Sequence, residues 1–413
     1  MKFTNFQLAK QVLSKLHNAK RPIILGIETS CDDTAVAIVS ADKQTLGQRV
    51  YVERTGQGQF GGINPAISAS QHRGHLDRLI EEVLDEVQCR ASDLDAVAVT
   101  TRPGLVICLK VGIERALAVA RNARLPLLPV HHMRAHALAG RLVDPDLQYP
   151  FLSLLVSGGH CLLVLVKGPT DFDLIGTAGK SSPGECIDKV GRAIGVDCRQ
   201  RHYGAEVERL ASLSSPEGPF RFEVKTPITP AADFNFDSLK SSYLQALLDK
   251  YKGIPADESD LIDFCASLQY QVTSHICRKL HVALDFLCSK TDIFAQNTPR
   301  SLVLSGGVAA NRFISTQVGK ICAHHGFTVV SPPPRLCTDN AEMIAWAGVE
   351  MFNEKNPDII SHLKLPSSIY AVDREPIGTS NLRTAIANYK VSRKLQPRSL
   401  FSERLSFYGK PIT

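Results

Sequence analysis

The sequence has no apolar run close to the ~20 residues that a membrane-spanning helix needs, and no Cys-x-x-Cys pair among its eleven cysteines. We therefore expect a protein that works without a membrane and is neither a zinc finger nor a small disulfide-stapled domain. Scattered thiols are typical of a reducing compartment. With 413 residues, 44% of them apolar, the chain can bury two ordinary cores.

Acidic side chains are missing from the first 27 residues, whose basic ones give a charge of +5: Lys2, Lys10, Lys15, Lys20 and Arg21. A basic, acid-free stretch that can form an amphipathic helix is the composition of a mitochondrial presequence, which we place at residues 1–22. An ordinary solvated helix is the alternative. Residues 361–413 carry a charge of +6 and are predicted to be a basic C-terminal extension that contacts a polyanion.

Three apolar segments of strand type each lead into a polar loop. Two of the loops are the Ser-Gly-Gly turns Ser157–Gly159 and Ser305–Gly307, and the third is Glu28–Asp33. A strand that breaks into a glycine turn leaves backbone N–H groups uncovered, and such groups suit an anionic phosphate. The three loops together predict a ligand that carries phosphate.

A hairpin pattern occurs twice along the chain. Segments 23–27 and 35–39 flank the first polar loop, and the pattern returns around the first Ser-Gly-Gly turn, in residues 151–166. Apolar side chains recur at helical spacing in segments that we predict to be helices: 76–87, 111–121, 238–251, 261–287 and 340–352. We expect an α/β fold with two duplicated lobes, residues 23–150 and 151–360.

His132 and His136 are four residues apart, so on a helix both imidazoles lie on one face and can bind the same metal ion. Two histidines are only a partial site, and such pairs occur by chance. Met133 stands where HExxH zinc proteases have their catalytic Glu, which argues against hydrolysis by that mechanism. Asp339 is either a third ligand or, with Glu342 three residues later, the cap of the following helix.

Asp32 and Asp33 lie in the first polar loop, where acids facing a phosphate would repel it. They fit a contact with a metal, a ribose or a nucleophile, and ordinary turn chemistry is the alternative. Asn311 begins a helix, and its amide either caps that helix or binds the ribose or base of a nucleotide.

Six motifs resemble, in the same order, those of the tRNA threonylcarbamoyladenosine transferases, a family once called O-sialoglycoprotein endopeptidases. They lie between about residue 23 and residue 352: Gly26–Ala37, His132–His136, Leu155–His160, Asp233–Lys240, Ser305–Asn311 and Thr338–Asn340. With its basic N-terminus, the chain is most similar to the mitochondrial member of that family.

The resemblance implies an actin-like (ASKHA) ATPase fold, with a ligand cleft between its two lobes. It implies transfer of threonylcarbamoyl from threonylcarbamoyl-AMP to the exocyclic amine of the adenosine beside the anticodon of ANN-decoding tRNAs. It also implies one divalent metal ion per subunit, Zn or Fe, a synthase that supplies the donor, a homodimer, and a place in the mitochondrial matrix.

The family's site residues can be carried over position by position. The metal ligands become His132, His136 and Asp339. The donor's phosphate would lie on Leu155, Val156, Ser157, Gly158 and Gly159, and the nucleoside would contact Asp188, Gly204 and Asn311. The attacking amine must lose a proton, so the candidate bases are Asp32 and Asp33.

Four positions depart from the family's motifs: Asp33 for a Glu, Arg102 for a Gly, Lys180-Ser181 for an Asp pair, and Tyr203 for a Gly. These changes fit a divergent organellar branch or altered contacts with partners. Three other functions remain open. An ATPase or kinase without a tRNA substrate would share the loops and the fold. A metalloprotease is disfavoured by Met133, and a non-catalytic nucleic-acid-binding protein would leave the three polar loops without a purpose.

Overall fold

The computed structural model describes residues 21–52, 63–197, 202–225, 227–230, 232–253, 255, 257–290, 292–294 and 298–391. The presequence predicted at residues 1–22 lies outside them except for its last two positions, and so does the chain from residue 392 onward. No helix within the described ranges is both long and apolar enough to cross a membrane.

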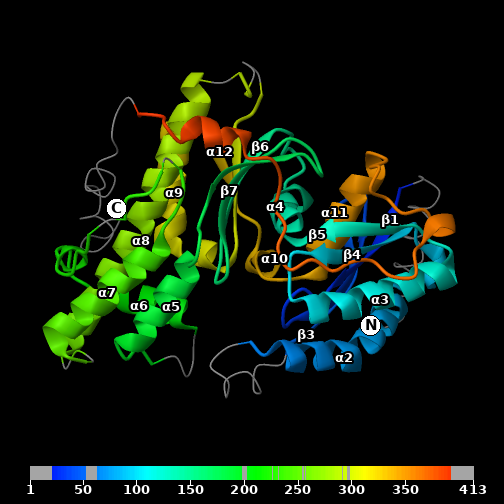
Figure 1. The fold of residues 1–413 in the computed structure, drawn as a ribbon, viewed down its shortest axis with the longest axis horizontal. Helices are drawn as coiled ribbons and strands as arrows, with labels where there is room; N and C mark the ends of the chain where they lie inside the picture. The colour runs from blue at the N-terminus through cyan, green and yellow to red at the C-terminus, as the bar shows by residue number, and fades with distance from the viewer. Residues whose placement is uncertain are drawn as a thin grey trace, which may run out of the picture. The chain divides into compact units, whose positions relative to one another are not determined.

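The chain forms two compact units (Figure 1). Unit 1 contains the described residues up to Asp146 and the later segment Arg335–Ile377, and unit 2 contains Leu147–Pro334 and the described residues from Gly378. The first boundary lies close to the one predicted near Pro150. The second does not, because the prediction assigned residues 335–360 to the second lobe and they pack in unit 1.

Unit 1 is built on a mixed sheet of order β3-β2-β1-β4-β5. Its strands are β1 (Ile23–Glu28), β2 (Thr34–Ser40), β3 (Thr45–Tyr51), β4 (Ala96–Arg102) and β5 (Leu127–His131). The middle strand β1 runs antiparallel to β2 and parallel to β4, while β2 is antiparallel to β3 and β4 is parallel to β5. The predicted hairpin around the first polar loop is therefore confirmed.

Helices cover both faces of this sheet (Figure 1). They are α2 (Pro65–Val87), α3 (Val106–Ala123), α4 (His132–Val143) and α11 (Ala341–Asn353). Shorter elements are the 3-10 turns η2 (Ala91–Asp93) and η5 (His362–Lys364) and the one-turn helix α10 (Pro334–Cys337), which begins at the boundary between the units. The apolar faces of α2 and α3 form one core with alternate strand residues such as Leu25 and Val97. This burial of an amphipathic face is what stabilises these helices.

Small residues bring α11 against the opposite face of the sheet. A Cβ on Gly26 in β1 would lie 2.5 Å from the Ala341 carbonyl oxygen and 2.6 Å from the Ala345 nitrogen. A Cβ on Gly348 would lie 2.7 Å from the Cβ of Ala98 in β4. Backbones this close require glycine, and this packing is the physical reason that α11 belongs to unit 1 and not to the second lobe.

Unit 2 repeats the topology of unit 1 in a second mixed sheet, of order β10-β9-β6-β7-β8. Its strands are β6 (Phe151–Val156), β7 (Cys161–Val166), β8 (Phe172–Thr177), β9 (Ser301–Ser305) and β10 (Thr328–Val330). The middle strand β6 is antiparallel to β7 and parallel to β9, as β1 is to β2 and β4. The predicted duplication is visible strand by strand.

The helices of unit 2 bury one face of this sheet in a single large core. They are α5 (Pro183–Ala193), α6 (Tyr203–Ala211), α7 (Phe236–Tyr251), α8 (Glu258–Lys290), α9 (Arg312–His324) and α12 (Asn381–Ile386), with 3-10 turns η3 (Gly218–Phe220) and η4 (Gly307–Ala310). The helices predicted at 238–251 and 261–287 are α7 and α8, each slightly longer than expected.

Residues 360–389, which we call the C-terminal strap, pack on the protein rather than extend from it. Ile360 exchanges two backbone hydrogen bonds with Leu127 of β5. Farther along, Arg383 donates to both carboxylate oxygens of Asp233, and Ile386 is fully buried. The first part of the predicted basic extension, residues 361–389, therefore packs on the protein, and its contact with a polyanion stays a prediction. Most of its densest basic cluster lies outside the described residues, namely Arg393, Lys394 and Arg398.

Candidate functional site

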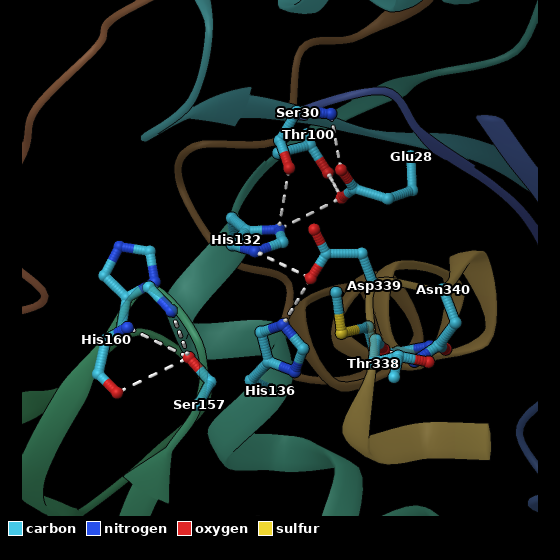
Figure 2. A network of polar contacts seen from close by, with 12 residues as sticks. Glu28, Ser30, Thr100, His132, His136, Ser157, His160, Thr338, Asp339 and Asn340 are labelled. Carbon is cyan, nitrogen blue, oxygen red and sulfur yellow. Dashed lines mark hydrogen bonds and ion pairs between the residues drawn. The ribbon is translucent and has the colours of Figure 1, made fainter. Parts of the chain in front are cut away.

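Three side chains of unit 1 converge on one point (Figure 2). His132 and His136 project from the first turns of α4, and Asp339 lies in the loop before α11. One oxygen of Asp339, Oδ1, lies 3.4 Å from His132 Nε2 and 3.1 Å from His136 Nε2. Ligand atoms from all three residues lie within 4.8 Å of one another, and this is the only such group among the described residues.

Local sequence explains why Asp339 can face the histidines. The cap of α11 is Asn340, whose Oδ1 accepts a hydrogen bond of 2.9 Å from the Met343 N–H. The capping alternative for Asp339 is therefore wrong, and the Asp339 carboxylate points to α4 (Figure 2). Because Arg335–Ile377 belongs to unit 1, all three ligand candidates also lie in one unit, and not in opposite halves of the fold as the predicted lobes implied.

Glu28, the last residue of β1, orients His132. Its Oε2 lies 3.2 Å from His132 Nδ1 and accepts a hydrogen bond from Thr100, while its Oε1 accepts one of 2.6 Å from the Ser30 N–H (Figure 2). A carboxylate on Nδ1 fixes the tautomer that leaves Nε2 for a metal. Sequence reasoning missed this residue, although an acid that ends an apolar, buried strand is a usable signal.

The carboxylates and imidazoles shift each other's ionisation. Burial alone would lower the pKa of His132, but Asp339 and Glu28 raise it to about 10. Burial would raise the pKa of Asp339, yet the charge of His132 and its hydrogen bond hold that pKa well below its usual range. The pKa of His136 is lowered, mainly by burial. The cluster thus stabilises a positive charge at its centre.

This donor set fits a divalent transition-metal ion. Two imidazole nitrogens and one carboxylate oxygen are the ligands of open, three-residue zinc and iron sites. The geometry supports a metal centre with His132, His136 and Asp339 as its ligands.

The two acids predicted as bases differ in their surroundings. Asp32 accepts a hydrogen bond from the Cys31 thiol, whose pKa is raised by burial and by the charge of Asp32, so Cys31 is no ready nucleophile. Asp33 instead lines a pocket of about 390 Å³ on unit 1, and Asp339 lines the same pocket. Of the two, Asp33 shares space with the metal ligands.

The first Ser-Gly-Gly turn follows β6 in unit 2 and is open. Leu155 and Val156 are buried strand residues, while Ser157 Oγ accepts hydrogen bonds from the N–H groups of Gly159 and His160 at 3.3 and 2.9 Å. A Cβ on Gly158 would meet nothing within 4 Å, and its φ is not in the left-handed region. Gly158 therefore carries no backbone strain, and the open space around it fits close approach by a ligand.

The second Ser-Gly-Gly turn lies at the same edge of the sheet, since Ser305 pairs with Leu155 on the parallel strand β6. In this turn the first glycine, Gly306, is required by the backbone. Gly306 has a φ of +96°, and a Cβ there would collide with the Val156 carbonyl. The repeated sequence therefore contains one open turn and one turn that needs glycine for packing.

The three predicted nucleoside contacts lie in connected elements of unit 2. Asp188 in α5 accepts a hydrogen bond from the Gly204 N–H in α6, and burial raises the pKa of Asp188. Asn311 caps α9 by accepting from the Ile314 N–H at 3.0 Å. Its amide group donates to Gln269 at 2.8 Å, so the capping alternative for Asn311 is confirmed.

Two departures from the family's motifs have structural partners. Arg102 donates to Glu375 of the C-terminal strap at 2.7 Å, and the Glu375 carbonyl lies 3.3 Å from Nε2 of His131, the neighbour of His132. The Arg192 guanidinium lies over the ring of Tyr203, with its Cζ 5.4 Å from the centre of that ring. Nothing in the structure explains Lys180, which is exposed.

Comparison with known proteins is consistent with this geometry. The family model described as tRNA N6-adenosine threonylcarbamoyltransferase (TsaD) matches residues 44–346. A Caenorhabditis elegans protein named "Probable tRNA N6-adenosine threonylcarbamoyltransferase, mitochondrial" is 45% identical, over 91% of this chain and 88% of its own. The Homo sapiens protein named "tRNA N6-adenosine threonylcarbamoyltransferase, mitochondrial" is 38% identical, over 79% of this chain and 80% of its own. The Brucella anthropi tRNA N6-adenosine threonylcarbamoyltransferase is also 38% identical, over 81% of this chain and 91% of its own.

Among solved structures, T. kodakarensis HypF aligns with a TM-score of 0.50 and 13% identity, over 81% of this chain and 48% of HypF. At that identity the likeness shows the fold alone. Together with the two sheets of equal topology, it confirms the predicted actin-like ATPase fold.

Proposed function

The chain belongs to the family of tRNA N6-adenosine threonylcarbamoyltransferases, and on that premise we propose how it carries out the transfer. The donor is threonylcarbamoyl-AMP, and the acceptor is N6 of the adenosine beside the anticodon of tRNAs that decode ANN codons. The donor is a mixed anhydride whose leaving group is AMP. The protein has to hold the phosphate, polarise the carbonyl and exclude water.

The observation that carries this proposal is the convergence of His132, His136 and Asp339 on one point. A divalent ion held by these residues supplies a Lewis acid for a carbonyl or phosphate oxygen. Glu28 keeps His132 in the tautomer that such an ion needs. Asp33, on the wall of the adjoining pocket, is the candidate base for the proton of the attacking amine.

The AMP end of the donor is assigned to unit 2. The open turn at Ser157–Gly159 would bind the phosphate, and Gly184 at the start of α5 lies against that turn, with its N–H bonded to the Ser157 carbonyl at 3.2 Å. On α5, Gly184 and Asp188 share one face, so the phosphate turn and the Asp188–Gly204 pair would hold neighbouring parts of one nucleotide.

The names of the relatives support the cellular setting that we propose. The Caenorhabditis elegans and Homo sapiens proteins are named as mitochondrial, and the basic residues 1–22 have the composition of a presequence. We assign the protein to the mitochondrial matrix, where a synthase of threonylcarbamoyl-AMP would supply its donor, and we expect it to act as a homodimer.

The test is direct transfer by the purified protein. Labelled threonylcarbamoyl-AMP is mixed with an ANN-decoding tRNA and with a matched tRNA whose acceptor adenosine is replaced by guanosine, and label on tRNA is scored. We expect label on the first tRNA only. Label on neither, with metal bound and the protein folded, would refute the proposal, and hydrolysis of ATP without transfer would favour the ATPase alternative.

A further inference from the structure

Unit 1 has a pocket of about 390 Å³ beside the metal centre, and its lining mixes two acids, two arginines and two valines. The acids are Asp33 and Asp339. The other lining residues come from β3 with the residue that follows it, from α10 and from the loop between α10 and α11: Gln48, Arg49, Val50, Val52, Arg335, Thr338 and Asn340. The mechanism described so far uses only the two acids.

Arg335 is held in place by a buried acid. Glu342 is completely buried, and it accepts hydrogen bonds from the Thr45 hydroxyl and from Nη1 of Arg335, the latter through both carboxylate oxygens. The Arg335 side chain is nevertheless 54% exposed. Guanidinium has five N–H donors, and among the described residues the bonds of Arg335 to Glu342 involve Nη1 alone, so Nε and Nη2 keep donors for a ligand of the pocket that Arg335 lines.

The positive charge of the other arginine in the lining, Arg49, is balanced by acids of α2. Arg49 lies 2.5 Å from Glu86 and 3.5 Å from Glu82, both on α2. Arg49 thus has two carboxylates as partners and Arg335 has one, Glu342, so Arg335 keeps more of its donors for an anionic ligand. Planar guanidinium binds carboxylates with two parallel hydrogen bonds.

Two valines form an exposed apolar wall. Val50 is 46% exposed and Val52 41% exposed. Residues two apart in an extended chain project to the same side, so the two side chains make one small apolar surface. It suits a methyl group rather than a large ring, and none of the described residues that line the pocket is aromatic.

We propose that this pocket binds the threonine part of the donor, with the threonine carboxylate on Arg335 and its methyl group against Val50 and Val52. This inference rests on the proposed function, because threonylcarbamoyl is the group transferred there. The carbonyl to be attacked is bonded to the threonine nitrogen, so seating threonine in this pocket brings that carbonyl to Asp339 and Asp33. The subsite would select donors by their amino acid.

The experiment measures binding with two probes. One is a sulfamide-linked, non-transferable analogue of threonylcarbamoyl-AMP, and the other is its threoninamide counterpart, in which the carboxylate is a carboxamide. By calorimetry with the full-length, metal-loaded protein, we expect the carboxylate probe to bind on the order of 10- to 100-fold more tightly, as for loss of a charge-assisted hydrogen bond.

Arg335→Lys is the informative variant, because lysine keeps the ion pair with Glu342 but loses the planar fork. We expect it to bind both probes with nearly equal, weak affinity. Arg115→Gln, another arginine of unit 1 paired with a single acid, Asp77, is the matched control and should discriminate like the wild type. Melting curves establish that each variant is folded, and Val52→Asp is a second variant that should weaken both probes.

The outcomes separate the two proposals. Undiminished discrimination in a folded Arg335→Lys protein, or none in a wild type that transfers label to tRNA, would overturn the threonine subsite. A wild type that discriminates between the probes but never labels tRNA would retain the subsite and refute the transfer reaction. A wild type that binds neither probe would overturn both.

Discussion

The two units have the same strand order and opposite chemistry at the same place in it. In unit 1, the middle strand β1 ends in a buried carboxylate, Glu28, which orients a histidine. In unit 2, the equivalent strand β6 ends in an open glycine turn. The comparison teaches that topology fixes where the functional loop lies. In the function proposed above, the residues at the strand end decide whether the loop binds a cation, through oriented side chains, or an anion, through exposed backbone N–H groups.

The largest effect is expected from loss of a ligand at the proposed metal centre of unit 1. Asp339→Asn removes the anionic oxygen but leaves the cap residue Asn340 in place. We expect metal content and turnover to fall by more than the ~10- to 100-fold that a change behind a ligand costs. His136→Ala should give the same defect, and the double variant should be little worse. Metal analysis of purified protein decides this, since full occupancy with normal transfer in Asp339→Asn would leave no ligand role for Asp339.

A smaller loss of metal affinity is expected from a change at Glu28, which contacts the ligand His132. Glu28→Gln keeps the shape of the side chain but removes its charge from His132 Nδ1. We expect metal affinity to fall by roughly 10- to 100-fold, with donor binding in unit 2 unchanged. Competition with a chelator measures the affinity. An unchanged affinity would mean that His132 needs no orienting carboxylate.

The proposed phosphate turn is tested with two glycines that hold the same position in the two Ser-Gly-Gly turns, Gly158 and Gly306. Gly158→Val adds a side chain in open space, so we expect weaker binding of the donor and a change of no more than ~0.5 kcal/mol in the free energy of unfolding. Gly306→Val meets the Val156 carbonyl at a φ of +96° and should destabilise the protein by at least ~1–3 kcal/mol. Calorimetry and denaturant unfolding measure the two. Equal instability of both variants would contradict the distinction between the turns.

The smallest effect is expected at the C-terminal strap. Arg102 and Glu375 form an ion pair whose side chains are 21% and 34% exposed, and pairs of this kind contribute about 0–1 kcal/mol. Glu375→Gln should therefore lower the free energy of unfolding by no more than about 1 kcal/mol, which denaturant unfolding measures. A double-mutant cycle with Arg102→Gln isolates the pair. A coupling energy of zero would mean that the strap only covers the surface near His131.

Local patterns were sufficient to predict most elements of the fold. The hairpin β1–β2, helices α7 and α8, and the i, i+4 pair of His132 and His136 all depend on short-range periodicity or spacing. The place of α11 could not be predicted in this way, because it depends on where Gly26 and Gly348 meet other chain segments. Contacts of this kind are set by packing between elements distant in the sequence.

The candidate site divides in the same way. The histidine pair and the open turn were visible as motifs, whereas Glu28 and Arg335 acquire a role only through partners 104 and 7 residues away. Asp339 was ambiguous between two uses. A metal ligand and a helix cap both account for an acid just before this helix, so the sequence does not distinguish them. The observed cap by Asn340 does, because it leaves Asp339 free of the capping role.

The return of the chain to unit 1 also sets an order of events during synthesis. His136 and Asp339 are separated by 203 residues, and the strands and helices of unit 2 up to β10 are encoded between them. At ~5–20 residues per second, a ribosome needs roughly 10–40 s to pass from one ligand to the next. During that interval the nascent chain presents two histidines and no Asp339, so the complete three-ligand centre can form only after most of unit 2 has been translated.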